Sequence, residues 1–279
     1  MRESYADILA TVEKGLQRSK LGDKLASKAR LALKILADWD YKYEVDKPQG
    51  AVMEAWEYAM GTYMHEYKIS DVRIRRTMRT YAATEHFVYK QIAKWAKESE
   101  TYADYCYMYD LNADNSCQEM VAYTFAKAIE DIETRLGPYT GSNWRMGDLV
   151  KSRYEHQFGT IAPLRPIFEE MREHSGNGRT NRMHNVFYHF EGMRFQSVSG
   201  SIFRMINDMS EPNMSYLAMD VETDQSRLWN TQKYERGMSQ IWNDDDYFKL
   251  PTYEVANEPK FQLSETSKKI FLYPTAAPK

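Results

Sequence analysis

The sequence lacks several features that would mark particular classes of protein. Among its 279 residues, 37 are lysine or arginine and 40 are aspartate or glutamate, which gives a formal net charge of −3. This balance argues against nucleic-acid binding, because proteins that bind nucleic acid present a basic face. No apolar run is long enough to cross a membrane, and residues 1–7 lack the apolar core of a secretory signal. The totals are those of a globular chain of one large domain or two small ones.

Cysteine is scarce, with two residues in the whole chain, Cys106 and Cys117. A short polar segment separates them, so a disulfide between them would close a small loop. Such a bond would fit an oxidising compartment, whereas two unpaired thiols would fit a reducing one. The spacing leaves both alternatives open.

Aromatic residues, in contrast, are abundant at 14%, with 21 tyrosines and 6 tryptophans. Such side chains suit large buried faces, or a surface that docks against another chain.

The first half of the chain shows helical periodicity. Apolar residues recur every three or four positions over 5–16, 25–36, 52–63 and 87–95. Between the second and third of these segments, residues 41–50 contain Asp46, Pro48 and Gly50 and are predicted to form a loop.

The clearest helix follows Ser116. Ser116 and Glu119 have the spacing of a capping box, in which the hydroxyl and the carboxylate each satisfy a free backbone N–H. Apolar residues then fall on one face over 121–136. Gly137 and Pro138 are predicted to end the helix, since a glycine with positive φ followed by proline is a common stop.

The composition changes after residue 140, where glycine and proline become frequent. Three runs rich in aromatic and β-branched residues are predicted as strands, Asn185–Phe190, Ser201–Asp208 and Tyr216–Val221. The expected class is therefore α+β, with a helical region over 1–140 and a mixed strand and loop region over 141–279. The tail after Pro251 is expected to wrap over a surface.

Strands that follow one another with little helix between them favour an antiparallel sheet. Three strands alone, however, would make a small sheet with exposed edges. The sequence thus predicts that these strands are additions to a sheet built by residues outside this chain.

A series of short elements carries a family resemblance. They are, in order, Asp38-Trp39-Asp40-Tyr41, Ala51 to Trp56, Trp144-Arg-Met-Gly147, His156, Pro163, Ser175 to Gly178, Asn185-Val186, Arg204 to Asp208, Gln225-Ser226, Asn230 to Tyr234, and Trp242 to Pro251. In this order and spacing they resemble the C-terminal part of the β-chain of penicillin amidases, most closely from Trp144 to Pro251. Three departures stand out: Tyr41 replaces a glycine of the family pattern, Met146 replaces an aromatic residue, and the glycines on either side of Gln225-Ser226 are missing.

The resemblance implies the αββα sandwich of an N-terminal-nucleophile hydrolase that cleaves linear amide bonds of acylated small molecules. In that family the nucleophile is the first residue of the β-chain, far upstream of these elements. The resemblance therefore implies that this chain holds no catalytic, cofactor-binding or metal-binding residue, the structural calcium common in the family being upstream. Its implied partners are the remaining α- and β-chain segments of one processed precursor, and its implied location is secreted, periplasmic, lysosomal or vacuolar. The alternative is a catalytically inactive scaffold or interaction protein derived from the family.

Ser142 is the one residue that imitates the nucleophile. The segment Gly141-Ser142-Asn143-Trp144 is similar to the self-cleavage site of the family, and cleavage there would free the serine amine as a general base. However, Trp144 fits the later turn element of the family better, and the residues after Ser142 are too few to build the nucleophile sheet. A structural turn is the favoured interpretation.

Other groups of polar residues imitate ligand sites, but structural or solvated roles are the favoured interpretation for each of them. Asp110, Asn112 and Asp114 imitate a calcium loop, but Asn115 stands where its glycine is needed. The pair His65-Glu66 lacks the second histidine of a zinc helix, and His184 and His189 fall on opposite faces of a strand. The arginines over 73–79 and the acidic run Asp244–Asp246 are predicted to be solvated. Arg204 and Asp208 share strand parity and are predicted to form a structural buried pair with neighbouring residues.

Overall fold

The computed structural model describes part of the chain, and every structural statement below concerns that part. The described residues are 2–18, 21–68, 106, 116–154, 156–173, 186–188, 195–201, 203–211, 214–219, 241–242, 244 and 246–251. The predicted helix over 87–95 lies outside them, as do Ser175 to Gly178, Gln225-Ser226 and Asn230 to Tyr234.

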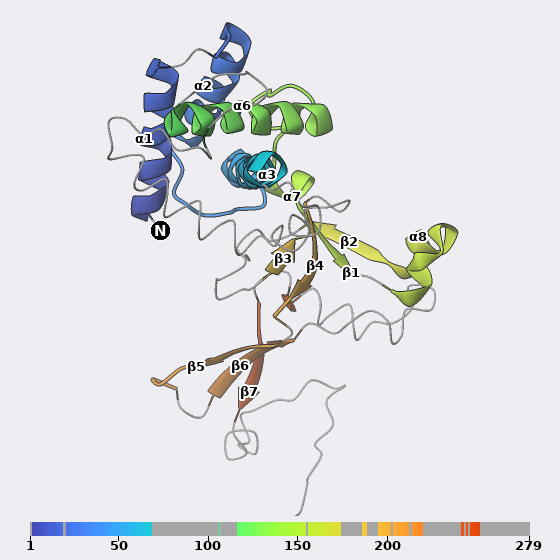
Figure 1. Cartoon of the computed structure of the whole chain (residues 1–279). Coiled ribbons are helices and arrows are strands. Elements are labelled where there is room, and N and C mark those ends of the chain that lie inside the picture. The colour runs from blue at the N-terminus through green and yellow to red at the C-terminus, as the bar shows by residue number, and fades with distance from the viewer. Residues whose placement is uncertain are drawn as a thin grey trace, which may run out of the picture.

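Helices dominate up to residue 149 and short strands follow (Figure 1). The helices are α1 (Arg2–Arg18), α2 (Asp23–Leu36), α3 (Pro48–Lys68), α6 (Cys117–Leu136), α7 (Met146–Leu149) and α8 (Arg165–Phe168), with 3₁₀ turns η3 (Gln157–Thr160) and η4 (Ala162–Leu164). The strands are β1 (Lys151–Tyr154), β2 (Glu170–Glu173), β3 (Val186–Tyr188), β4 (Gln196–Gly200), β5 (Phe203–Asn207), β6 (Met214–Met219) and β7 (Phe248–Pro251).

Helix α6 is the centre of a helical bundle and packs against α1, α2 and α3 (Figure 1). The residues that pack it are those whose periodicity predicted helices, among them Ile8 and Ile129, both fully buried. Trp56 of α3 stacks on Phe125 of α6 with 4.7 Å between ring centroids, and its Nε1 donates to Thr124 Oγ1 over 3.1 Å. None of the helices in the described ranges combines the length and apolar character that crossing a bilayer requires.

Helices α1 and α6 approach each other closely at Gly15. A Cβ atom at this position would lie 2.1 Å from the carbonyl oxygen of Gln118, well inside van der Waals contact. The two helices can therefore keep this separation only with glycine at position 15.

Both ends of α6 form as the sequence predicts. The Ser116 hydroxyl accepts from the Glu119 N–H over 3.2 Å, and the Glu119 carboxylate accepts from the Ser116 N–H over 2.8 Å, which completes the capping box. At the other end Gly137 has φ +79° and ψ 177°, and its N–H donates to the Glu133 carbonyl. The extended ψ agrees with the proline that follows, because Pro138 disfavours helical ψ in the residue before it.

The connection between α2 and α3 is held by aromatic side chains. Tyr41 has φ +67°, a conformation that tyrosine rarely adopts, and this is the position where the family pattern has glycine. Its ring stacks on that of Tyr5 from α1, with centroids 5.4 Å apart. Trp39 packs edge-on against Tyr5 and Tyr43, and the hydroxyls of Tyr5 and Tyr43 lie 3.0 Å apart. Stacking thus stabilises a turn whose backbone alone would favour glycine.

The first sheet has four strands in the order β2-β1-β4-β3. Strand β1 pairs antiparallel with β2 but parallel with β4, and β4 pairs antiparallel with β3. The sheet is therefore mixed, whereas the sequence predicted antiparallel strands alone. Phe195, directly before β4, is buried with φ +58°, and its ring lies against Arg135 and Tyr58 of the bundle. This contact joins the sheet to the helices.

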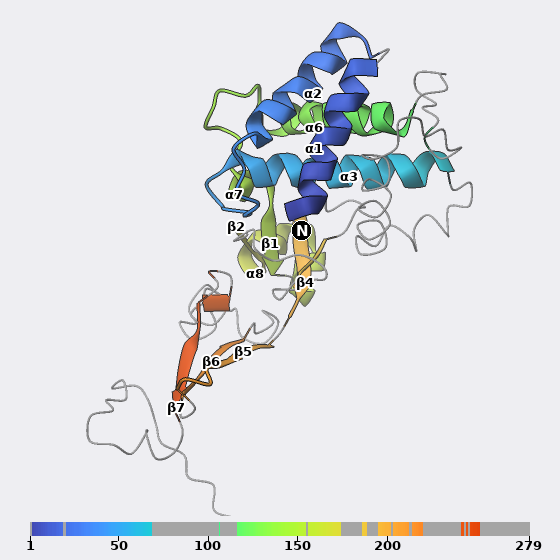
Figure 2. The ribbon, with the colours of Figure 1, turned by 90° about the vertical axis from the view of Figure 1, so that its left-hand side faces the viewer.

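The second sheet is a three-stranded antiparallel sheet in the order β5-β6-β7. Strands β3, β5 and β6 correspond to the three predicted runs, each shorter than predicted or shifted by a few residues. This sheet lies beyond the first one, on the side away from the bundle (Figure 2). Helices followed by mainly antiparallel strands give the α+β architecture expected from the sequence.

Candidate functional site

Ser142 lies in an exposed turn after α6 that its neighbour Asn143 holds together. The Asn143 Oδ1 accepts from the backbone N–H and the hydroxyl of Thr140 over 2.8 and 3.0 Å. Its Nδ2 donates to the carbonyls of Leu136 and Pro138 over 3.2 and 2.9 Å. One amide side chain therefore ties the turn to the end of the helix.

Trp144 anchors the other end of this turn. It is fully buried, its Nε1 donates to the Gly137 carbonyl over 2.8 Å, and its ring lies 4.9 Å from that of Tyr139. The geometry around Ser142 is that of a structural turn, which supports the favoured interpretation of this segment.

Arg145 connects the bundle to the first sheet. Its guanidinium contacts Asp46 over 2.8 Å, Glu173 over 3.2 Å and Asp148 over 3.3 Å. These carboxylates raise the pKa of Arg145, and the largest cause is the hydrogen bond that Arg145 donates to Asp46. The three acids belong to the loop before α3, to α7 and to β2. No group of three metal-ligating side chains suited to a metal ion occurs among the described residues. The cluster is therefore best described as a junction between elements.

An excursion between β1 and β2, residues 156–169, projects beside the first sheet and contains η3, η4 and α8 (Figure 1). At its base Arg153 forms a two-pronged ion pair with Glu169, with N–O distances of 2.9 and 3.1 Å. The Nδ1 of His156 accepts from the Phe158 N–H over 3.1 Å, and its ring stacks on Phe168 at 4.9 Å. His156 thus starts a 3₁₀ turn, a structural role, and the excursion is braced at its base.

The tip of the excursion is exposed and apolar. Phe158, Ile161 and Ile167 are 52%, 54% and 42% exposed. Over residues 157–167 the only charged residue is Arg165, whose Nε donates to the Gly159 carbonyl. Exposed apolar patches on a rigid support are typical of protein interaction sites. Sequence periodicity could not reveal this one, although the presence of a single charged residue over 157–167 is a usable signal.

A second exposed apolar surface covers one side of the β5–β6–β7 sheet. The strand registers align Met205, Leu217 and Phe248 across the three strands, and Phe203 lies two residues before Met205 on β5. Because side chains alternate along a strand, these residues and Leu250 share one side of the sheet, called here the open face. Four of its residues are large and exposed, namely Phe203, Met205, Phe248 and Leu250.

The opposite side of this sheet is covered at Arg204 and Ala218, whereas Ile206 near the hairpin end is 44% exposed. Arg204 is 8% exposed, and its guanidinium lies 5.2 Å from the Trp242 ring and 5.4 Å from the Tyr247 ring, while it also donates to the Trp242 carbonyl. Asp208 lies outside β5 and is exposed, and its Oδ1 accepts from the N–H and hydroxyl of Ser210. The prediction that Arg204 and Asp208 are buried with neighbouring residues therefore holds for Arg204 and is wrong for Asp208, because β5 ends at Asn207 and Asp208 lies in the hairpin loop.

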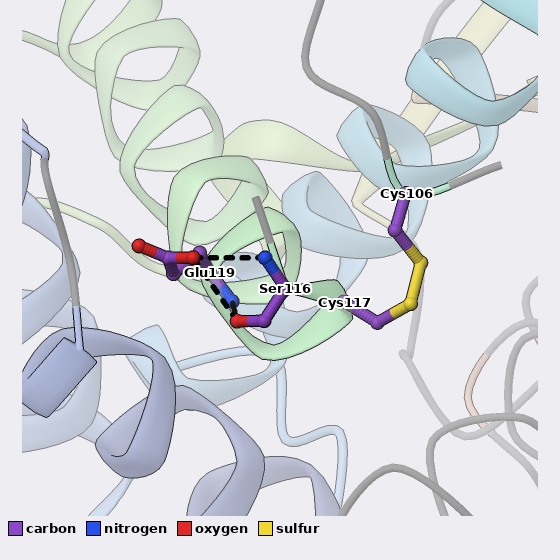
Figure 3. The surroundings of a disulfide bond; sticks show 4 residues. All are labelled: Cys106, Ser116, Cys117 and Glu119. Atoms are coloured by element: carbon purple, nitrogen blue, oxygen red, sulfur yellow. Dashed lines mark hydrogen bonds between the residues drawn. A yellow bond between two sulfur atoms is a disulfide. The ribbon is translucent and has the colours of Figure 1, made fainter. Parts of the chain in front are cut away.

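Cys106 and Cys117 form a disulfide, which decides between the two alternatives left by the sequence (Figure 3). Both residues are fully buried, with their Cα atoms 4.9 Å apart. Cys117 is the first residue of α6, directly after the capping serine. The covalent bond and the capping box thus fix the same helix end.

Several residues considered from the sequence lie outside the described residues. These are Asp110, Asn112, Asp114, His184, His189, the arginines over 73–79, Asp245 and the side chain of His65. Asp244 and Asp246 are both exposed, as a solvated acidic turn requires.

Comparison with known proteins assigns the family. The family model described as penicillin amidase matches residues 2–258, nearly the whole chain. No curated protein matches the sequence.

Proposed function

The chain belongs to the penicillin amidase family, and we propose that it is the C-terminal segment of a hydrolase that cleaves linear amide bonds of acylated small molecules. The family match over residues 2–258 carries this proposal. The nucleophile resides on a companion segment encoded upstream, in line with the surroundings of Ser142, whose neighbours build a turn. In the assembled enzyme an N-terminal serine attacks the amide carbonyl, and its own free amine acts as the general base.

This chain contributes the scaffold of that enzyme. The α1–α2–α3–α6 bundle lies beside the acyl pocket, and the strands complete an αββα sandwich whose remaining strands belong to the companion. Two features support such an assembly. Among the described residues β5 and β7 each have a neighbouring strand on one side only, and the tip of the excursion exposes Phe158, Ile161 and Ile167. Unpaired strand edges and apolar knobs are both suited to binding another chain.

The disulfide supports a location in an oxidising compartment. Buried structural disulfides persist in secreted, periplasmic and lysosomal or vacuolar proteins, while cytosolic thiols stay reduced. We expect alkylation of the native protein under denaturing conditions, without reductant, to label neither cysteine. Labelling of both would contradict this location.

The proposed function is tested on the native protein. Its intact mass and the N-terminal sequences of all co-purifying chains should reveal a companion that begins with serine, threonine or cysteine, and the assembly should hydrolyse acylated amides. A companion with such an N-terminus but no hydrolysis, together with a persistent complex, would instead favour the inactive scaffold. A stable protein that purifies as this chain alone would contradict the segment proposal.

The excursion offers a direct test of the companion interface. Phe158→Asp with Ile161→Asp should abolish co-purification of the companion, because two carboxylates would be buried at an apolar contact. The matched control is Gln157→Asp with Thr160→Asp, at exposed polar positions of the same turn. Equal recovery of the companion with both double variants would place the interface elsewhere.

A further inference from the structure

The open face of the β5–β6–β7 sheet needs a cover that the described residues do not supply. Phe203 is 55% exposed, Met205 47% and Leu250 43%. Met205 lies in one row with Leu217 and Phe248 across the three strands, and Phe203 and Leu250 lie two residues from this row on the same side of β5 and β7, so together they form one apolar surface. A surface of this kind on a small sheet is normally buried against another segment or chain.

The chain itself provides a segment at the right place. Strand β7 is one edge of the sheet and ends at Pro251, and residues 252–279 follow it as the C-terminal tail. Fully extended, this tail reaches about 90 Å at roughly 3.3 Å a residue, whereas the three strands span only about 10 Å. The tail is long enough to turn back and cross the open face.

The tail also has a matching sequence. It carries an apolar run at Ile270-Phe271-Leu272-Tyr273, in which Ile270 and Leu272 share one side of an extended chain. Proline follows at Pro274, and the family match ends at residue 258, before this run. A segment beyond the matched part of the family can thus cover the face without a companion.

Opposite charges in the tail and in the β5–β6 turn indicate where the apolar run lies on the sheet. Pro251 pairs with Met214, so the tail leaves β7 at the end of the sheet where the β5–β6 turn lies. That turn presents the exposed carboxylates of Asp208 and Glu211. Two cations, Lys268 and Lys269, directly precede Ile270 in the tail. Lysines near the turn would put the apolar run over the open face next to it.

We propose that residues 268–273 of the tail pack on the open face, with Ile270 and Leu272 against Met205, Leu217 and Phe248 and the two lysines near Asp208 and Glu211. The open face is then covered by a segment of the same chain. This packing leaves the strand edges free, and it does not depend on a companion.

Cross-linking tests the packing in the full chain. Both native cysteines are held in their own disulfide, so any new disulfide involves only the introduced cysteines. Met205→Cys with Leu272→Cys should form an intramolecular disulfide on mild oxidation, mapped by peptide mass spectrometry. The control, Met205→Cys with Leu263→Cys, should form several times less. A bond between two chains would show that a second copy covers the face, and equal yields from both pairs would overturn the proposed register.

Hydrogen exchange gives an independent readout. Ile270→Asp with Leu272→Asp should speed exchange in peptides 203–207 and 248–251 at least several-fold, while exchange in α6 stays unchanged. Phe261→Asp with Leu263→Asp serves as the control and should leave the sheet protected. Unchanged protection of the sheet in the first variant overturns the proposal. The measurement is made whether or not a companion co-purifies, so loss of the companion contradicts the proposed function and not this packing.

Discussion

The helical bundle and the β5–β6–β7 sheet bury their apolar residues in different ways. In the bundle α6 packs against three other helices, and its apolar residues from Met120 to Ile132 are at most 2% exposed. The strands of the sheet contact chiefly one another, and one side of the sheet remains open. The bundle therefore has a core of its own, whereas the sheet depends on whatever covers it. The difference indicates two units of unequal stability within one chain.

The largest expected effect compares two buried tryptophans. Trp56→Ala should lower the free energy of unfolding of the bundle by about 4 kcal/mol, because a fully buried ring and its stacking on Phe125 are lost. Trp242→Ala should leave the unfolding of the bundle within about 0.5 kcal/mol of the wild type and instead speed hydrogen exchange in β5 and β6. Helical circular dichroism in denaturant measures the first effect. If both variants shifted this transition equally, the two regions would be one cooperative unit.

The disulfide should stabilise the bundle almost as strongly. Cys106→Ala with Cys117→Ala is expected to cost about 3 kcal/mol, since the unfolded chain regains the freedom that the closed loop removes. Ser116→Ala, which removes the neighbouring cap and leaves the bond, should cost about 1 kcal/mol. Denaturant titrations without reductant compare the two. A larger loss of stability in Ser116→Ala than in the double cysteine variant would contradict this prediction.

Gly15 tests how tightly the bundle is packed. Gly15→Ala should cost about 2 kcal/mol, because the added methyl group forces α1 away from the Gln118 carbonyl. Gly22→Ala is the control, with no atom within 4 Å of the added Cβ, and should cost at most about 1 kcal/mol, because Gly22 is the N-cap of α2 and alanine caps a helix less well. Thermal unfolding followed by circular dichroism distinguishes them. Equal melting temperatures would mean that α1 moves aside at no cost.

The smallest effect belongs to the hairpin of the sheet. Hydrogen bonds from the Ser210 hydroxyl and N–H lower the pKa of Asp208, so the hairpin gains stability above the ordinary pKa of the carboxyl and loses it as the pH falls through the lowered pKa. Ser210→Ala should move the pKa of Asp208 back toward its ordinary value, as measured by NMR titration. Tyr216, whose pKa Glu211 raises, gives an internal reference that should not move. An unchanged pKa of Asp208 would assign its lowering to the backbone alone.

The helices could be predicted from the sequence because their signals are local. Periodicity located α1, α2 and α3, and Ser116, Glu119 and Gly137 marked both ends of α6. Local propensity and neighbouring side chains decide such elements.

The strands β1, β2 and β4 could not be predicted in the same way. Each has four or five residues with polar or small side chains, such as Lys151 and Ser152 in β1 and Ser197 in β4. They form because distant segments pair, and β1 even pairs in parallel with β4. For the same reason the open face became visible only once the registers of β5, β6 and β7 were known, although the runs behind two of these strands were predicted.

The turn at Tyr41, which has positive φ, makes the conformation of the connection into α3 depend on α1. Glycine would let the link between α2 and α3 adopt positive φ on its own, but here the rings of Tyr5 and Trp39 pack against Tyr41 and support its conformation. Fraying of α1 would consequently loosen the connection that leads into α3, which begins at Pro48. Helix α1 thus stabilises the connection between α2 and α3, and a truncation that removes Tyr5 is expected to destabilise this connection.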